Sequence, residues 1–163
     1  MERLFVNLAR IGTVLALVVV TMGAWVRLTD AGLGCPDWPG CYGRLIVSEE
    51  IAADPDVAHL TAARPLEAGK AWREMIHRYC ASGVGFICLA LAFIAIRRRQ
   101  EPRQPVVLPL VLLGLVILQG LLGMWTVTLQ LLPIVVVLHL FGGLSVASCP
   151  PSLLRATNFS PGT

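Results

Sequence analysis

Residues 111–118 read VLLGLVIL and form the middle of an apolar run, 106–127, that decides the fold. A strand that crosses a membrane alternates polar and apolar side chains, and this run shows no such alternation. A helix needs about 20 largely apolar residues to cross the hydrocarbon of a bilayer. Three further runs approach or exceed that length: 4–26, 75–96 and 131–147. We therefore predict an all-α integral membrane protein, a four-helix transmembrane bundle over residues 1–147.

The composition agrees with a membrane protein. Hydrophobic residues make up 56% of the 163 residues and charged residues 14%, and the mean hydropathy is +0.73. Soluble domains carry roughly 25% charged residues. The net charge of +3 is too small and too dispersed for a nucleic-acid partner. The partner surface that the composition predicts is the lipid bilayer.

Arginine placement predicts the orientation. Arginines gather near the N-terminus and in the short loop after the second span: Arg3, Arg10, Arg97, Arg98, Arg99 and Arg103. Cytoplasmic loops are enriched in such residues, so both places are predicted to be cytoplasmic. The loop 28–74, with eight acidic and four basic residues, is then outside. We expect a multi-pass protein of the bacterial inner membrane with a cytoplasmic N-terminus and a periplasmic 28–74 loop.

The outer loop begins with a stretch rich in Gly, Pro and Asp, 29–43, which predicts turns. It contains Cys35 and Cys41, and an oxidising compartment favours a disulfide between them. A metal site is less favoured, because no histidine or second cysteine pair stands nearby to complete four ligands. A structural bridge is favoured over a redox-active one. No role is assigned to the cysteines of the predicted helices: Cys80, Cys88 and Cys149.

Two histidines lie within predicted spans, where polar side chains are costly and tend to mark function. His77 is about 8 Å and His139 about 12 Å below the outer face, counted at 1.5 Å per residue. Glu74 lies three residues before His77, on the same helix face. Two imidazoles at similar depth suit the axial ligands of one heme iron. From the residues alone, a helix–helix hydrogen bond, a proton path and a quinone site remain alternatives.

The sequence also resembles bacterial heme A synthases. The resemblance covers about residues 5–147 and is carried by short motifs. They are GAWVRLT at 23–29, GLGCPDWPGC at 32–41, EMIHR at 74–78, LQGLLGMWTV at 118–127 and LHL at 138–140. The family fold that the resemblance implies has eight helices in two similar four-helix halves. This chain corresponds to the N-terminal half.

The resemblance implies a membrane oxidoreductase that oxidises the methyl group of heme O to the formyl group of heme A, for cytochrome oxidase assembly. It implies that His77 and His139 are the axial ligands of the substrate heme iron. It makes Glu74 the catalytic carboxylate beside the reacting methyl, and Cys35 and Cys41 an outer-loop disulfide. The family's cofactor heme b belongs to the second half. Implied partners are heme O and heme A, heme O synthase, and a second copy or a C-terminal half.

The stretch 148–163 follows the fourth span. Its double proline, Pro150-Pro151, predicts a helix break and an irregular tail, as in a truncated or frameshifted terminus. We therefore expect the substrate half without the cofactor half, and no activity unless another chain pairs with it. A non-catalytic heme-binding or oxidase-assembly membrane protein is the first alternative. A thiol–quinone oxidoreductase fits less well, because the loop near 128–132 has no cysteine and the two membrane histidines would have no role.

Overall fold

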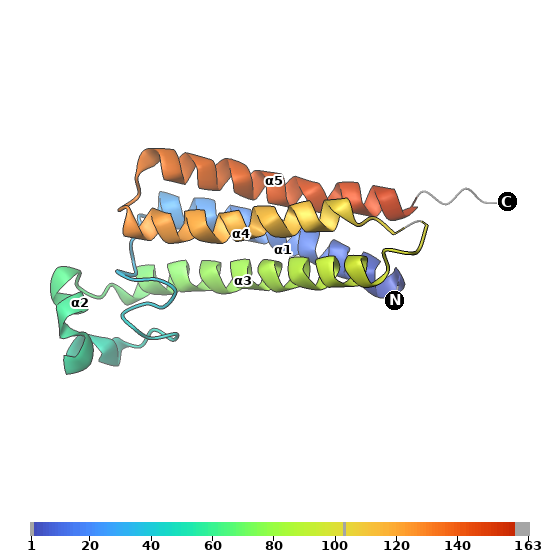
Figure 1. Cartoon of the computed structure of the whole chain (residues 1–163). Helices are drawn as coiled ribbons and strands as arrows, with labels where there is room; N and C mark the ends of the chain where they lie inside the picture. The colour runs from blue at the N-terminus through green and yellow to red at the C-terminus, as the bar shows by residue number, and fades with distance from the viewer. Residues whose placement is uncertain (1, 103, 159–163) are drawn as a thin grey trace.

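The computed structural model describes residues 2–102 and 104–158 and is all-α, as predicted. Four long helices lie side by side (Figure 1). They are α1 (Glu2–Leu28), α3 (Ala68–Arg97), α4 (Val107–Thr128) and α5 (Pro133–Asn158). Helix α1 packs on α3 and α5, and α4 packs on the same two helices, so the four form a closed ring. One end of this bundle carries the segment between α1 and α3; we call it the loop end and the opposite one the arginine end.

Three of the helices are long and apolar enough to cross a membrane: α1 from Arg3 to Leu28, α3 and α4. The apolar part of α5, Pro133–Cys149, is shorter. Large apolar side chains are exposed along the outside of the bundle, such as Phe86, Ile117 and Phe141. An outer surface of this kind is stable in lipid and unstable in water. The prediction of a four-helix membrane bundle is confirmed.

One sequence expectation about the helix ends is wrong. Helix α5 continues through Pro150 and Pro151 to Asn158, so the irregular tail does not begin at Ser148. A proline removes one backbone donor, and membrane helices tolerate this where neighbouring groups make up the lost bond. Residues 159–163 of the predicted tail lie outside the described residues. Helix α3 also begins seven residues before the predicted Met75, at Ala68, which places Glu74 within the helix.

The segment 29–67, which we call the cap, covers the loop end of the bundle. It begins with turns over 29–43, as predicted, and continues in short helices: η1 (Glu49–Ala53), η2 (Pro55–Val57) and α2 (Ala58–Ala63). Asp30 and Tyr42 have positive φ values of 50° and 53° within the turns. Buried cap side chains, among them Tyr42 and Val47, pack against Ala71 and Met75 of α3. The cap therefore has a small hydrophobic core of its own on the first turns of α3.

Candidate functional site

The cap is attached to α3 through Glu74 and Arg78. Glu74 is only 4% exposed, and its Oε2 accepts a hydrogen bond from the backbone N–H of Cys35 at 3.0 Å. Its Oε1 pairs with the guanidinium of Arg78, one turn further along the helix. Arg78 also donates to three cap carbonyls, those of Asp37, Pro39 and Gly40, at 3.1, 3.2 and 2.5 Å. Charge-assisted bonds of this kind are stronger than neutral ones, so this pair fixes the cap on the bundle.

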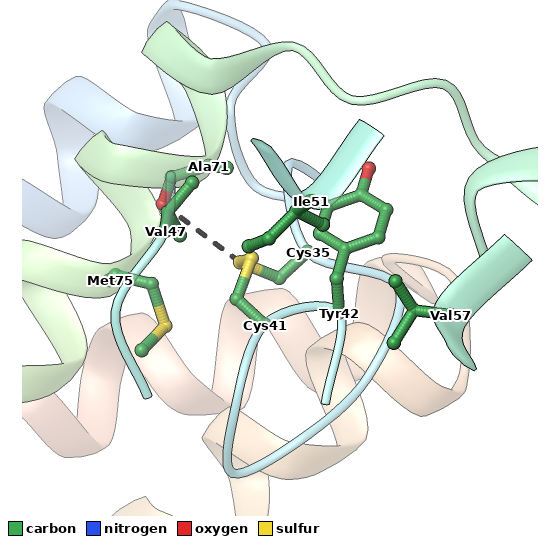
Figure 2. Close-up of a cluster of buried hydrophobic side chains, with 8 residues drawn as sticks. All are labelled: Cys35, Cys41, Tyr42, Val47, Ile51, Val57, Ala71 and Met75. Atoms are coloured by element: carbon green, nitrogen blue, oxygen red, sulfur yellow. Dashed lines mark hydrogen bonds between the residues drawn. A yellow bond between two sulfur atoms is a disulfide. The ribbon is translucent and has the colours of Figure 1, made fainter. Parts of the chain in front are cut away.

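The predicted disulfide between Cys35 and Cys41 is present, and both residues are fully buried. Figure 2 shows it beside Met75, with the Sγ of Cys35 3.9 Å from the carbonyl oxygen of Ala71. The chain passes so close to α3 here that a Cβ at Gly34 would lie 2.6 Å from the backbone of Lys70. The bridge therefore closes a loop that lies directly on the helix carrying Glu74 and His77.

His77 lies on α3 and His139 on α5, and both side chains are partly buried in the bundle. The ring of His77 lies against Gly23 of α1, where a Cβ would be 3.0 Å from its Cε1. The ring of His139 lies against Gly123 of α4, where a Cβ would be 3.4 Å from its Cε1. The Nδ1 atom of each histidine is buried and has no hydrogen-bond partner. We call the two histidines and the glycines against which they pack the histidine site; these residues come from all four long helices.

Residues 7–156 match the family of cytochrome oxidase assembly proteins designated COX15-CtaA. The chain belongs to this family. The match extends over all four long helices and the cap, so it includes both histidines, Glu74 and the disulfide.

Among relatives, the chain is 48% identical over 144 residues to the heme A synthase of Shewanella oneidensis. The aligned part covers 86% of this chain and 42% of the relative. It is 35% identical over 127 residues to the heme A synthase of Caulobacter sp. strain K31, covering 71% and 37% of the two chains. It is 28% identical over 161 residues to that of Halalkalibacterium halodurans, covering 98% and 47%. The chain therefore spans less than half the length of these relatives. No solved structure matches it.

The two imidazoles of the histidine site in this COX15-CtaA family member are donors of the type that heme iron takes. Heme takes its remaining ligands from the macrocycle, so two imidazoles on opposite sides suffice. The Nδ1 atom of each histidine has no hydrogen-bond partner among the described residues, and Gly23 and Gly123 leave room beside the Cε1 atom of each ring. A bare metal ion has less support, because no group of three or more His, Cys, Asp or Glu side chains among the described residues could hold one.

Glu74 lies one turn from His77, as predicted, but the bonds of its carboxylate go to the cap. The sequence did not predict this, because the Cys35 donor is 39 residues away in the chain. The catalytic role of Glu74 therefore stays a prediction. Two cavities found among the described residues lie away from the histidines, one where the cap meets α3 at Gly34 and Lys70, the other on the outer face of α1 near Arg10.

Sequence reasoning overlooked one polar side chain inside the bundle, Gln119 of α4. Its Nε2 and Oε1 are both buried, and neither has a hydrogen-bond partner. The amide fills the space left by Gly142 of α5, where a Cβ would be 1.9 Å from Nε2. The signal that could have identified it is a glutamine in the apolar middle of a predicted membrane helix.

Proposed function

We propose that the chain binds the heme O substrate of a heme A synthase reaction between His77 and His139. In this reaction the methyl group at one pyrrole position becomes a formyl group: it gains an oxygen atom, from water in the balanced half-reaction, and releases four electrons and four protons. The electrons would pass to the cofactor heme of the proposed partner or C-terminal half. The observation that carries the proposal is the pair of histidines, from α3 and α5 of one four-helix bundle, whose buried Nδ1 atoms have no hydrogen-bond partner. Membership in the COX15-CtaA family and similarity to heme A synthases support the same reaction.

Each residue has a proposed part in this reaction. His77 and His139 would hold the iron of heme O through their imidazoles and so position the substrate. Bound heme O supplies the iron and the methyl group that is oxidised. Glu74, next to the cap, accepts a proton from the reacting group or stabilises positive charge on it. Arg78 holds the Glu74 carboxylate in place, and the disulfide keeps the cap closed over the loop end.

The proposal includes an orientation and partners. Arginine-rich loops favour the cytoplasmic side, so the cap is periplasmic in a bacterial inner membrane. A cysteine introduced for the exposed Glu50 of the cap should then react with an impermeant maleimide in intact cells. One introduced for the exposed Gln100, at the arginine end, should react only after lysis; the reverse pattern contradicts the orientation. Heme O synthase as the source of heme, and a second copy or C-terminal half as the carrier of a cofactor heme, are the proposed partners.

Heme titration of the protein purified in detergent tests the site. The wild-type chain should give the optical spectrum of low-spin heme with two histidine ligands. His77→Ala and His139→Ala should each lose that spectrum, because one axial ligand is removed. His59→Ala is the matched control, since His59 is exposed on α2 in the cap. A low-spin spectrum that survives both membrane substitutions contradicts the proposal.

Pigment extraction after incubation with heme O separates the enzyme from a non-catalytic heme-binding protein. Formation of heme A supports the enzyme, and bound heme O without conversion supports the binder. Glu74→Gln should retain heme binding and stop conversion, because an amide cannot accept the proton. The double variant Cys35→Ser, Cys41→Ser removes the disulfide and loosens the cap, and it keeps the Glu74 side chain. Equal loss of conversion in both variants would show that Glu74 acts only through the cap.

A further inference from the structure

Gln119 is a polar group that the histidine site does not explain. Its amide has two donor hydrogens and an acceptor oxygen. Both heavy atoms are buried without a partner, in a helix that is otherwise apolar at this depth. A buried polar group that lacks a hydrogen bond costs about 1–3 kcal/mol. A position that bears this cost in the absence of ligand is a candidate for a ligand contact.

The usual use of such a residue is a hydrogen bond between membrane helices. The amide lies directly against α5, since Cβ atoms at Gly142 and Gly143 would be 1.9 Å from its Nε2 and 3.8 Å from its Oε1. In spite of this proximity, no bond to α5 or to any other described residue is formed. Helix–helix hydrogen bonding therefore does not account for Gln119.

The place of Gln119 along the bundle is defined from two helices. In α4 it comes four residues before Gly123, against which His139 packs, which is about 6 Å along the axis. In α5, Gly142 comes three residues after His139, about 4.5 Å along the axis. Because α4 and α5 run in opposite directions, both counts place the amide about one turn from the histidines, toward the arginine end. Gly143 also contacts Val20 of α1, so this layer lies in the interior of the bundle.

A heme held between the two histidines presents chemically different edges to the two ends of the bundle. Its propionates are charged, and charge is costly in the apolar interior. Both histidines lie nearer the loop end, in the first part of α3 and of α5, so the propionates would face the cap. The opposite edge then faces Gln119. In heme O this edge carries an isoprenoid chain joined through a carbon that bears a hydroxyl group, whereas heme B has a vinyl group there. A hydroxyl donates one hydrogen bond and accepts others, which is what an amide can complete.

We propose that Gln119 is a specificity-determining residue that hydrogen-bonds the hydroxyl group of the heme O side chain. The inference rests on the proposed function, since it requires heme between His77 and His139. With heme O bound, the amide gains the partner that the protein does not supply. With heme B bound, the amide stays unpaired, so Gln119 selects for the hydroxylated substrate. Heme A retains this hydroxyl and is bound through the same contact.

Optical titration of Gln119→Met with three hemes tests the inference. Methionine has a similar length and flexibility and no polar hydrogen-bonding group of comparable strength. The Kd values for heme O and heme A should each rise about tenfold, and that for heme B should stay within about twofold. The apoprotein should unfold at the same temperature or a higher one, because a buried unpaired amide is removed. Leu118→Met, on the neighbouring and partly lipid-exposed side chain, is the matched control and should change none of these values.

The possible outcomes separate this inference from the proposed function. An equal rise for all three hemes overturns it and makes Gln119 a packing residue. A rise for heme A alone also overturns it, because the partner would then be the formyl group. If the wild-type chain gives no low-spin spectrum with any heme, the proposed function itself fails. If the wild type binds all three and Gln119→Met changes no Kd, only the present inference fails.

Discussion

The cap and the bundle interior treat buried polar groups in opposite ways. In the cap, the carboxylate of Asp37 accepts from the backbone N–H groups of Tyr42 and Gly43 at 2.6 and 2.8 Å, and Glu74 and Arg78 bind each other and the loop. In the interior, described side chains with buried atoms that lack a partner include His77, Gln119 and His139. Native proteins pair almost all buried polar groups. The polar groups of the cap thus bond to one another, whereas these interior groups have no partner among the described residues.

This difference separates residues whose polar groups stabilise the fold from residues that are proposed to contact a ligand. Substitutions at the cap contacts should lower the free energy of unfolding, because each leaves a partner without its bond. Substitutions at the unpaired interior groups should cost little stability and should change ligand binding. The predictions that follow test this separation.

The largest loss of unfolding free energy is expected for Glu74→Ala. It leaves the guanidinium of Arg78 without its counter-charge at a position where the side chain is only 13% exposed. Loss of one partner from a buried ion pair costs about 3–5 kcal/mol, and the remaining carbonyl contacts of Arg78 favour the lower end. Thermal or denaturant unfolding in detergent measures it. Glu67→Ala is the control, because the ion pair of Glu67 with Lys70 is exposed and contributes at most about 1 kcal/mol. Equally small losses of unfolding free energy in both variants would contradict the role of Glu74 in attaching the cap.

Substitutions at Gly34 and Gly142 should both lower the free energy of unfolding, but a second substitution should restore it only for Gly142. Gly34→Ala places a Cβ 2.6 Å from the backbone of Lys70, and backbone must move, at a cost of about 2–3 kcal/mol. Gly142→Ala places a Cβ against the flexible end of Gln119, which costs about 1–2 kcal/mol. Gln119→Ala should relieve the second clash, so that Gly142→Ala becomes neutral or stabilising in that background, as a double-mutant cycle would show. Additive losses at 119 and 142 would contradict the contact.

Much of this could be predicted from local sequence. Each long helix lies at an apolar run, three of them long enough to cross a membrane, and the turns of 29–43 follow from their Gly, Pro and Asp content. The spacing of Cys35 and Cys41 in an expected periplasmic loop predicted their disulfide. These features depend on residues close in the chain, and the bilayer imposes a strong constraint on which segments are helical.

The rest depends on contacts between distant segments. The bond from Cys35 to Glu74 spans 39 residues, and no local pattern distinguishes a carboxylate that binds a loop from one that faces a ligand. That the Gln119 amide lies against Gly142 of α5 could be seen only once the two helices were placed side by side. Helix α5 continues through Pro150 and Pro151, so the double proline, read from local sequence alone, gave a wrong prediction of the helix end.

Reduction of the disulfide should loosen the cap and leave the histidine site intact. Closing so short a loop contributes about 2 kcal/mol in the chain-entropy account. Cys35→Ser with Cys41→Ser should therefore lower the unfolding free energy by about that amount and speed proteolysis within 29–67. The low-spin spectrum of bound heme should persist, with Cys80→Ser as the control for a cysteine outside the bridge. Loss of the spectrum on reduction would mean that the cap and the histidine site are not separate.

The smallest loss of unfolding free energy is expected for Tyr42→Phe in the cap core. The Tyr42 hydroxyl donates to the carbonyls of Arg64 and Pro65 at 3.1 and 3.3 Å, and burial raises the pKa of this phenol. Its loss should cost about 1 kcal/mol at neutral pH. A phenol whose pKa is higher in the folded state stabilises the fold below its unfolded pKa of about 10, and this contribution disappears as the pH rises through the folded pKa. The difference in unfolding free energy between wild type and Tyr42→Phe should therefore be constant from pH 7 to about pH 9 and shrink above it. Parallel stability curves up to pH 11 would show that Tyr42 contributes to the cap through its ring alone.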